Sequence, residues 1–130
     1  MNGQVIIISY DELKILLYNR GFRSCNGILM PDRELSDEEV LQSMNKLALR
    51  GMIKAGEEKF AIRPETAAWV DLIGAPMSSY SFSDPATGQV YYCYLSDTMV
   101  VVTENYLPKK ETLRVRIFTP EAFSAWREEL

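Results

Sequence analysis

The sequence predicts an α+β fold in which a winged-helix-like helical half packs with an antiparallel β-meander and a C-terminal helix. Residues 35–64 combine a capped amphipathic helix with two short strands around a glycine, which is the outline of a helix and its wing. From Tyr80 onward, β-branched and aromatic runs alternate with turn residues. We expect a single domain over residues 1–130, because neither the helical half (1–75) nor the sheet-rich half (76–130) would bury much surface alone.

The chain is expected to begin with a buried strand and a short helix. The run "QVIII" at residues 4–8 is β-branched and apolar on both faces, which predicts burial on both sides. Ser9 and Glu12 have capping-box spacing, and they predict a helix over residues 10–20. Residues 21–35 contain glycines and a proline without a helical period, so they predict an extended connection.

A second helix, the wing and a third helix are expected next. A capping box at residues 36–39 opens the second helix. Its apolar face consists of Val40, Leu41, Met44, Leu47 and Ala48. Residues 52–54 and 59–63 flank Gly56 as a hairpin. The segment 64–76 predicts a helix opened by one proline and ended by a glycine and a second proline. The side chains on its buried face are predicted to be Ala68, Trp69, Leu72 and Ile73.

The second half predicts a meander of up to four strands, over residues 80–83, 90–95, 98–104 and 112–118. A tight turn is expected at Ser96 and Asp97. Thr119 and Pro120 predict the start of a closing helix. One side of that helix carries Phe123, Trp126 and Leu130.

The composition indicates an ordered chain with little attraction for nucleic acid. Hydrophobic residues make up 47% of the 130 and charged residues 25%, so the chain is neither disordered nor fibrous. The net charge is −4, and no large segment carries a basic excess that would attract phosphates. The longest apolar run, residues 90–95, is too short to cross a bilayer, and residues 1–4 do not resemble a signal peptide. We therefore expect a cytoplasmic protein without membrane contact.

The chain contains no histidine. This absence removes the commonest general base, the Ser–His and Cys–His nucleophile pairs and most zinc sites. Cys25 and Cys93 form no CxxC pair, so we expect two free, buried thiols and no metal. Most acidic residues lie in first helical turns, where they favour the helix dipole. We expect no catalytic residue, no cofactor and no enzyme activity, with a small enzyme using carboxylates as the third alternative.

The helix and wing raise the alternative of a winged-helix DNA-binding transcriptional regulator. Side chains of types that contact bases or phosphates are Gln42, Asn45, Lys46, Arg50, Lys54 and Lys59. Acidic residues oppose such docking at both the helix start (37–39) and the wing tip (57–58). A helix-turn-helix also needs a helix directly before the recognition helix, whereas residues 21–35 look extended. These observations favour a scaffold over a DNA-binding surface.

The aromatic strands predict where a protein partner binds. Alternation along residues 112–118 separates three inward aliphatic side chains from two outward arginines. The outer face is then predicted to combine Tyr92, Tyr94, Met99, Val101, Arg114 and Arg116. Tyrosine, methionine and arginine are enriched in protein interfaces. The alternative is that a helix of the same chain covers this face, because the helices are numerous enough to cover both sides of the sheet.

Four segments in order carry a family resemblance: "ISYDELKILLYNRGF", "LSDEEVLQSMNKLALRGMI", "FAIRPETAAWVDLIGAP" and, after a meander, "TPEAFSAW". Their order resembles the EspG-type chaperones of type VII (ESX) secretion and shorter relatives in Gram-positive bacteria. The resemblance spans most of the chain and implies a cofactor-free cytoplasmic adaptor that holds a secretion substrate on sheet and helical-hairpin surfaces. It assigns a role to no individual residue.

We therefore expect a non-catalytic protein-binding module, for which an adaptor or chaperone of a secretion substrate is the form that the resemblance implies. The expected partner is another protein, and the charge pattern and hydropathy favour neither nucleic acid nor a membrane. The sequence leaves a homo-oligomer open, and it does not identify the partner.

Overall fold

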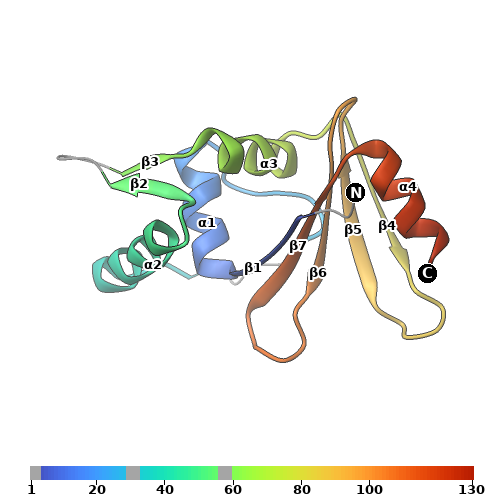
Figure 1. The fold of residues 1–130 in the computed structure, drawn as a ribbon. Coiled ribbons are helices and arrows are strands. Elements are labelled where there is room, and N and C mark those ends of the chain that lie inside the picture. The colour runs from blue at the N-terminus through green and yellow to red at the C-terminus, as the bar shows by residue number, and fades with distance from the viewer. Residues whose placement is uncertain (1–3, 29–32, 56–59) are drawn as a thin grey trace.

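The computed structural model describes residues 4–28, 33–55 and 60–130. Its elements, in chain order, are β1 (Gln4–Ser9), α1 (Tyr10–Asn19), α2 (Asp37–Leu49), β2 (Ile53–Ala55), β3 (Phe60–Ile62), α3 (Pro64–Gly74), β4 (Ser78–Ser83), β5 (Val90–Leu95), β6 (Val100–Asn105), β7 (Thr112–Phe118) and α4 (Pro120–Glu128). The predicted α+β class is confirmed: an antiparallel sheet with strand order β1-β7-β6-β5-β4 lies between the helical half and α4 (Figure 1).

The described helices begin where the local sequence predicts. The Ser9 hydroxyl accepts from Glu12 N–H while the Glu12 carboxylate accepts from Ser9 N–H, so both partners of the first capping box are present. Ser36 and Glu39 form the same reciprocal pair at the start of α2. Helices α3 and α4 each start at a proline, where the missing N–H costs no intrahelical bond. These starts confirm the predicted caps.

The connection and the wing also match their predictions in the described residues. Gly21, directly after α1, has a φ of 87°, which a glycine adopts without steric cost. Residues 21–28 and 33–36 form no helix or strand, in agreement with an extended connection. Strands β2 and β3 pair antiparallel as the predicted hairpin. Its turn lies outside the described residues, and so do Gly56 and Lys59.

The first strand departs from its prediction, because β1 is an edge strand and only one of its faces is buried. It pairs antiparallel with β7 and extends the predicted meander to five strands. Ile6 and Ile8 are 8% and 1% exposed, whereas Val5 and Ile7 are 50% and 37% exposed. The expectation of a strand buried on both faces is therefore wrong, because helices cover only the face that Ile6 and Ile8 share.

The hairpin between β5 and β6 has the predicted faces but a different turn. Ser96 N–H donates to Met99 C=O at 2.9 Å, so the central turn residues are Asp97 and Thr98. Tyr94 consequently pairs with Val101, two positions beyond its partner under the predicted turn. A shift of two residues leaves every side chain on its own face, because strand alternation has a period of two.

The sheet has two differently covered faces. The inner face packs against α1 and α3, and its buried side chains are Ile6, Ile8, Tyr94, Val101, Leu113 and Val115. The opposite face, called here the α4 face, packs in part against α4, and its buried apolar side chains are Tyr91, Cys93, Val100, Val102 and Phe118. Two predicted core positions are wrong: Leu41 on α2 is 55% exposed and Ala68 on α3 is also exposed, because each points away from the neighbouring elements.

No helix within the described ranges is long and apolar enough to span a membrane.

Candidate functional site

The six residues predicted to form an outer binding face do not share a face. The four uncharged ones, Tyr92, Tyr94, Met99 and Val101, belong to or pack against the core on the inner face. Tyr94 and Val101 are 1% and 0% exposed there. Arg114 and Arg116 lie on the α4 face, because Val102 and not Val101 pairs with Arg116 across β6 and β7. The prediction of one common face is therefore wrong.

The tyrosine side of the sheet is covered by the chain itself. Helix α3 packs on β5 and β6. The Tyr94 hydroxyl donates a hydrogen bond to the Asn26 carbonyl, and burial raises the pKa of Tyr94 well above its usual value. A Cβ atom at Gly27 would lie 2.4 Å from Cδ1 of the Tyr92 ring, so the backbone passes directly over that ring. The alternative that a helix of the same chain covers the face with Tyr92 and Tyr94 is therefore correct.

The α4 face is covered in part, and its other part forms a candidate binding surface. Helix α4 packs over β4, β5 and the end of β7 through Phe123 and Trp126. Strands β1 and β7 continue beyond the part of this face that α4 covers (Figure 1). There Val5, Ile7, Arg114 and Arg116 stay partly exposed. We call this surface the open strip. It consists of these four side chains together with the buried Glu104 of β6 and with Tyr106, which follows β6.

Strand pairing sets the order of side chains in the open strip. Val5 lies opposite Arg116, and Ile7 lies opposite Arg114. Directly paired residues of antiparallel strands point to the same face, so each exposed aliphatic side chain stands beside a guanidinium. The strip therefore places a row of apolar side chains on β1 beside a row of cationic side chains on β7.

Glu104 and two aromatic rings hold the two arginines in place. The Glu104 side chain is 5% exposed, and its Oε1 atom lies 2.9 Å from Arg116 Nη2 and 3.5 Å from Arg114 Nη1. The Arg114 guanidinium lies 5.2 Å from the centroid of the Tyr106 ring, and that of Arg116 lies 5.4 Å from the Trp126 ring. One carboxylate against two guanidiniums leaves the cluster with one net positive charge. These arginines are ordered before any partner binds, which lowers the entropy cost of using them.

Side chains of the same chain occupy two backbone groups at the edge of β1. Ser9 N–H donates to Glu12 Oε1 at 3.0 Å, and the Arg50 guanidinium donates to the Ile7 carbonyl. Arg50 Nη1 also lies 3.3 Å from Glu12 Oε2. Side chains that occupy edge groups in this way prevent strand addition. A partner at the open strip would therefore contact the side chains of Val5 and Ile7 more than the strand edge.

The residues of the DNA-binding alternative lie on an electrostatically neutral surface. Gln42, Asn45, Lys46, Arg50 and Lys54 are exposed, and Lys59 lies outside the described residues. Gln42 and Lys46 on α2 and Arg50 directly after it border a hollow of about 510 Å³ beside the loop between β6 and β7. The charged side chains that line it are basic at Lys46, Arg50, Lys109 and Lys110, and acidic at Asp11, Glu12, Glu39 and Glu111. Equal numbers of each sign supply no net field to attract phosphate.

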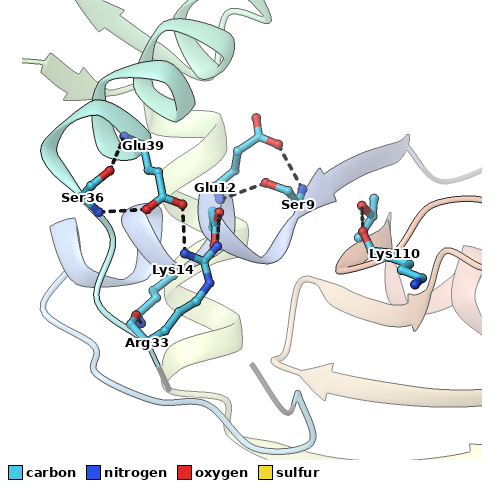
Figure 2. A network of polar contacts seen from close by, with 9 residues as sticks. Ser9, Glu12, Lys14, Arg33, Ser36, Glu39 and Lys110 are labelled. Carbon is cyan, nitrogen blue, oxygen red and sulfur yellow. Dashed lines mark hydrogen bonds and ion pairs between the residues drawn. The ribbon is translucent and has the colours of Figure 1, made fainter. Parts of the chain in front are cut away.

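The start of α2 is also occupied by contacts within the chain (Figure 2). Arg33 lies 2.9 Å from Asp11 Oδ2 on α1 and 2.9 Å from Glu39 Oε2 on α2, so it joins the two helix starts. Lys14 Nζ donates to the Arg33 carbonyl at 2.8 Å. The backbone N–H of Ser36 and the Arg33 guanidinium lower the pKa of Glu39 below its usual value. A recognition helix inserts this end into the groove, and here it presents a carboxylate.

Neither the cysteines nor the acidic side chains of the described residues form a reactive or metal-binding site. Burial raises the pKa of both the Cys25 and the Cys93 thiol to about 11, so neither is a ready nucleophile at neutral pH. In the part of the chain that the structure describes, no group of three or more His, Cys, Asp and Glu side chains is placed to hold a metal ion. Helices α1 and α2 border an apolar hollow of about 560 Å³ that includes Ile15, Tyr18 and Met44.

Sequence reasoning found the two arginines of the open strip and missed the other members. The alternation of Arg114 and Arg116 with aliphatic residues was the signal that found them. Val5 and Ile7 gave the opposite signal, because a β-branched run without polar residues is typical of a fully buried strand. Their exposure follows from the position of β1 at the edge of the sheet.

Comparison of the sequence with models of protein families finds no match, and comparison with curated proteins also finds none.

Proposed function

We propose that the protein is a non-catalytic protein-binding module and that its partner binds the open strip. The observation that carries the proposal is the exposure of Val5 (50%) and Ile7 (37%) beside two arginines that are already held in place. Arginine and aromatic residues supply much of the binding energy in protein interfaces, most strongly where neighbouring apolar groups exclude water. An adaptor or chaperone for a secretion substrate is the specific form of this function that the family resemblance suggests.

The chemistry of the strip suggests the chemistry of its partner. Val5 and Ile7 would be buried against an apolar side chain, and Arg114 and Arg116 would donate hydrogen bonds to a carboxylate of the partner. The single net positive charge of the arginine cluster favours an acidic partner surface and opposes a basic one. We therefore expect a partner segment in which an acidic residue neighbours an aliphatic or aromatic one.

A photo-crosslinking amino acid at position 5 tests the proposal in cells of the source organism. A discrete crosslinked protein is expected from position 5. The matched control is position 90, because Val90 is a 40% exposed valine on β5, which β6 and β7 separate from β1. Once the partner is identified, Val5→Ser should weaken its binding by about tenfold, and Val90→Ser should leave it unchanged. Equal crosslinks from both positions, or equal effects of both substitutions, would refute the assignment of the open strip.

A second measurement separates the proposal from the regulator alternative. A DNA-binding protein with several phosphate contacts stays on heparin at about 0.15 M salt, and its retention falls steeply as salt increases. We expect the chain to pass through heparin without retention at that salt. Retention that is lost when Lys46 and Arg50 are replaced by glutamine would favour the α2 surface and DNA.

A further inference from the structure

Strand β4 ends the sheet at the edge opposite β1, and like β1 it has no charged residue. It pairs with β5 over the whole of Ser78–Ser83 without a bulge. Its side chains are exposed apart from a half-buried Phe82. Regular, uncharged edges of this length are templates for a further strand, and proteins usually block them with charges, prolines or bulges.

The hydrogen-bond pattern identifies the backbone groups that point out from this edge. Asp84 N–H donates to Gln89 C=O at 2.9 Å, which continues the register of β4 and β5. In an antiparallel pair, alternate residues direct both their N–H and C=O groups toward the neighbouring strand. Tyr80 and Phe82 therefore bond to β5. Three serines direct their backbone groups outward: Ser79, Ser81 and Ser83.

The two edges of the sheet are treated differently by the fold. At β1, Arg50 bonds to the outward C=O of Ile7, and Glu12 accepts from the outward N–H of Ser9. At β4, no hydrogen bond from another described residue reaches the outward groups of Ser79, Ser81 and Ser83. As far as the described residues go, a strand can therefore add at β4 without displacing an existing hydrogen bond.

We propose that a second copy of this chain adds at β4, with a twofold axis through Ser81 and perpendicular to the sheet. Ser81 then pairs with Ser81 of the other copy, and Ser79 pairs with Ser83 in both directions. Each pair exchanges two N–H···O=C bonds, so every outward backbone group of the three serines is satisfied. The two five-stranded sheets become one continuous antiparallel sheet.

The side chains of β4 are complementary to themselves in this pairing, which is the argument for a second copy as the occupant. On the inner face, each outward serine lies opposite another serine. On the α4 face, Tyr80 lies opposite Phe82 of the other copy, an aromatic cross-strand pair. The absence of charge means that two identical strands do not repel each other. A self-complementary patch of this kind is what a twofold dimer requires.

The ring that each Tyr80 would meet is already ordered. Phe82 lies 5.1 Å from the Tyr91 ring and 6.1 Å from the Trp126 ring, measured between centroids. The Arg127 guanidinium lies 3.7 Å from the centroid of the Phe82 ring. A fixed aromatic partner loses little entropy on association. These contacts come from β5 and α4, so they do not depend on the second copy.

Sedimentation equilibrium between about 10 µM and 1 mM tests the proposal, because a short edge-to-edge interface predicts weak association. We expect a monomer–dimer equilibrium. Ser81→Pro removes the outward N–H from both sides of the central pair and should raise the dissociation constant about tenfold or more. Ser81→Lys places two cations opposite each other and should abolish the dimer. The matched control is Ser124→Lys, which adds the same charge on an exposed position of α4 and should not change association.

Mixing variants and measuring amide exchange make the result independent of a folding defect. Ser81→Lys and Ser81→Asp should each be monomeric alone and should form a heterodimer when mixed. In the unmodified protein, amide exchange at Ser79, Ser81 and Ser83 should slow as concentration rises, whereas Tyr80 and Phe82 should be protected throughout. A monomer over the whole range, or a dimer that Ser81→Pro and Ser81→Lys leave unchanged, would overturn the proposal. A monomer that binds a different protein at β4 would also overturn the proposal. Photo-crosslinking from position 5 is unaffected by these outcomes, because Val5 lies at the opposite edge.

Discussion

Replacing Tyr94 with alanine should destabilise the fold severely. Tyr94 is 1% exposed and packs in the core between the inner face and α3. Its hydroxyl donates to the carbonyl of Asn26, which lies in the segment between α1 and α2. The substitution removes a complete aromatic ring from this core and breaks the link to that segment. An interface tyrosine, by contrast, would tolerate the change with little loss of stability.

The two parts of the tyrosine side chain contribute unequally. Loss of a fully buried aromatic ring costs about 3–5 kcal/mol, because the cavity closes only in part. Tyr94→Phe removes the hydroxyl alone and should cost about 0.5–1.5 kcal/mol, the usual contribution of one hydrogen bond. The lower end of that range applies, since Asn26 is exposed and its carbonyl can bond to water. For a chain of this length, the alanine variant should melt about 10–20 °C lower.

Urea and thermal unfolding followed by circular dichroism measure these differences. Tyr18→Ala is the matched control, because Tyr18 is 55% exposed on α1 and the same atoms are removed. We expect the control to change the free energy of unfolding by about 0.5 kcal/mol or less. If Tyr94→Ala and Tyr18→Ala cost the same, the inner face is not the core described above, and the original assignment of Tyr94 to an interface would have to be restored.

Further predictions concern the backbone, the pH response and the thiols. Gly27→Ala should lower the free energy of unfolding in urea by about 2 kcal/mol or more, because φ is +83° and a Cβ would overlap the Tyr92 ring. Gly88→Ala is the control and should lower it less, because φ is +76° but the space around Gly88 is open. The pKa of Glu39 is lower in the folded chain than its usual 4.5, chiefly because Ser36 N–H bonds to the carboxylate. Its stabilising contribution is therefore present above pH 4.5 and is lost as pH falls through the folded pKa. Glu39→Gln should therefore reduce the fall in the free energy of unfolding at acid pH. An unchanged pH dependence of that free energy would contradict this. Because burial raises the pKa of Cys93 to about 11, its thiol should react with a thiol reagent at pH 8 far more slowly in the native protein than in urea; equal rates would show that it is accessible.

Local sequence determined the positions of the helices and most strands. The capping boxes at Ser9 and Ser36 and the prolines at the starts of α3 and α4 act within one turn of the chain, so no distant contact is needed to interpret them. The wing hairpin and the meander strands follow from alternation and turn residues in the same way. The predicted faces of β5 and β6 are correct although the predicted turn between them is wrong, because the register differs by two residues.

Tertiary structure alone decided which groups are exposed. The pairing of β1 with β7 joins residues more than 100 positions apart, and no local pattern specifies it. That pairing placed Val5 and Ile7 at an open edge, although their sequence is typical of a buried strand. Likewise, the register of β6 and β7 put Arg116 opposite Val102 and separated it from Tyr94. A period of two tells which residues of one strand share a face, but only pairing and helix packing between distant segments determine which face meets solvent.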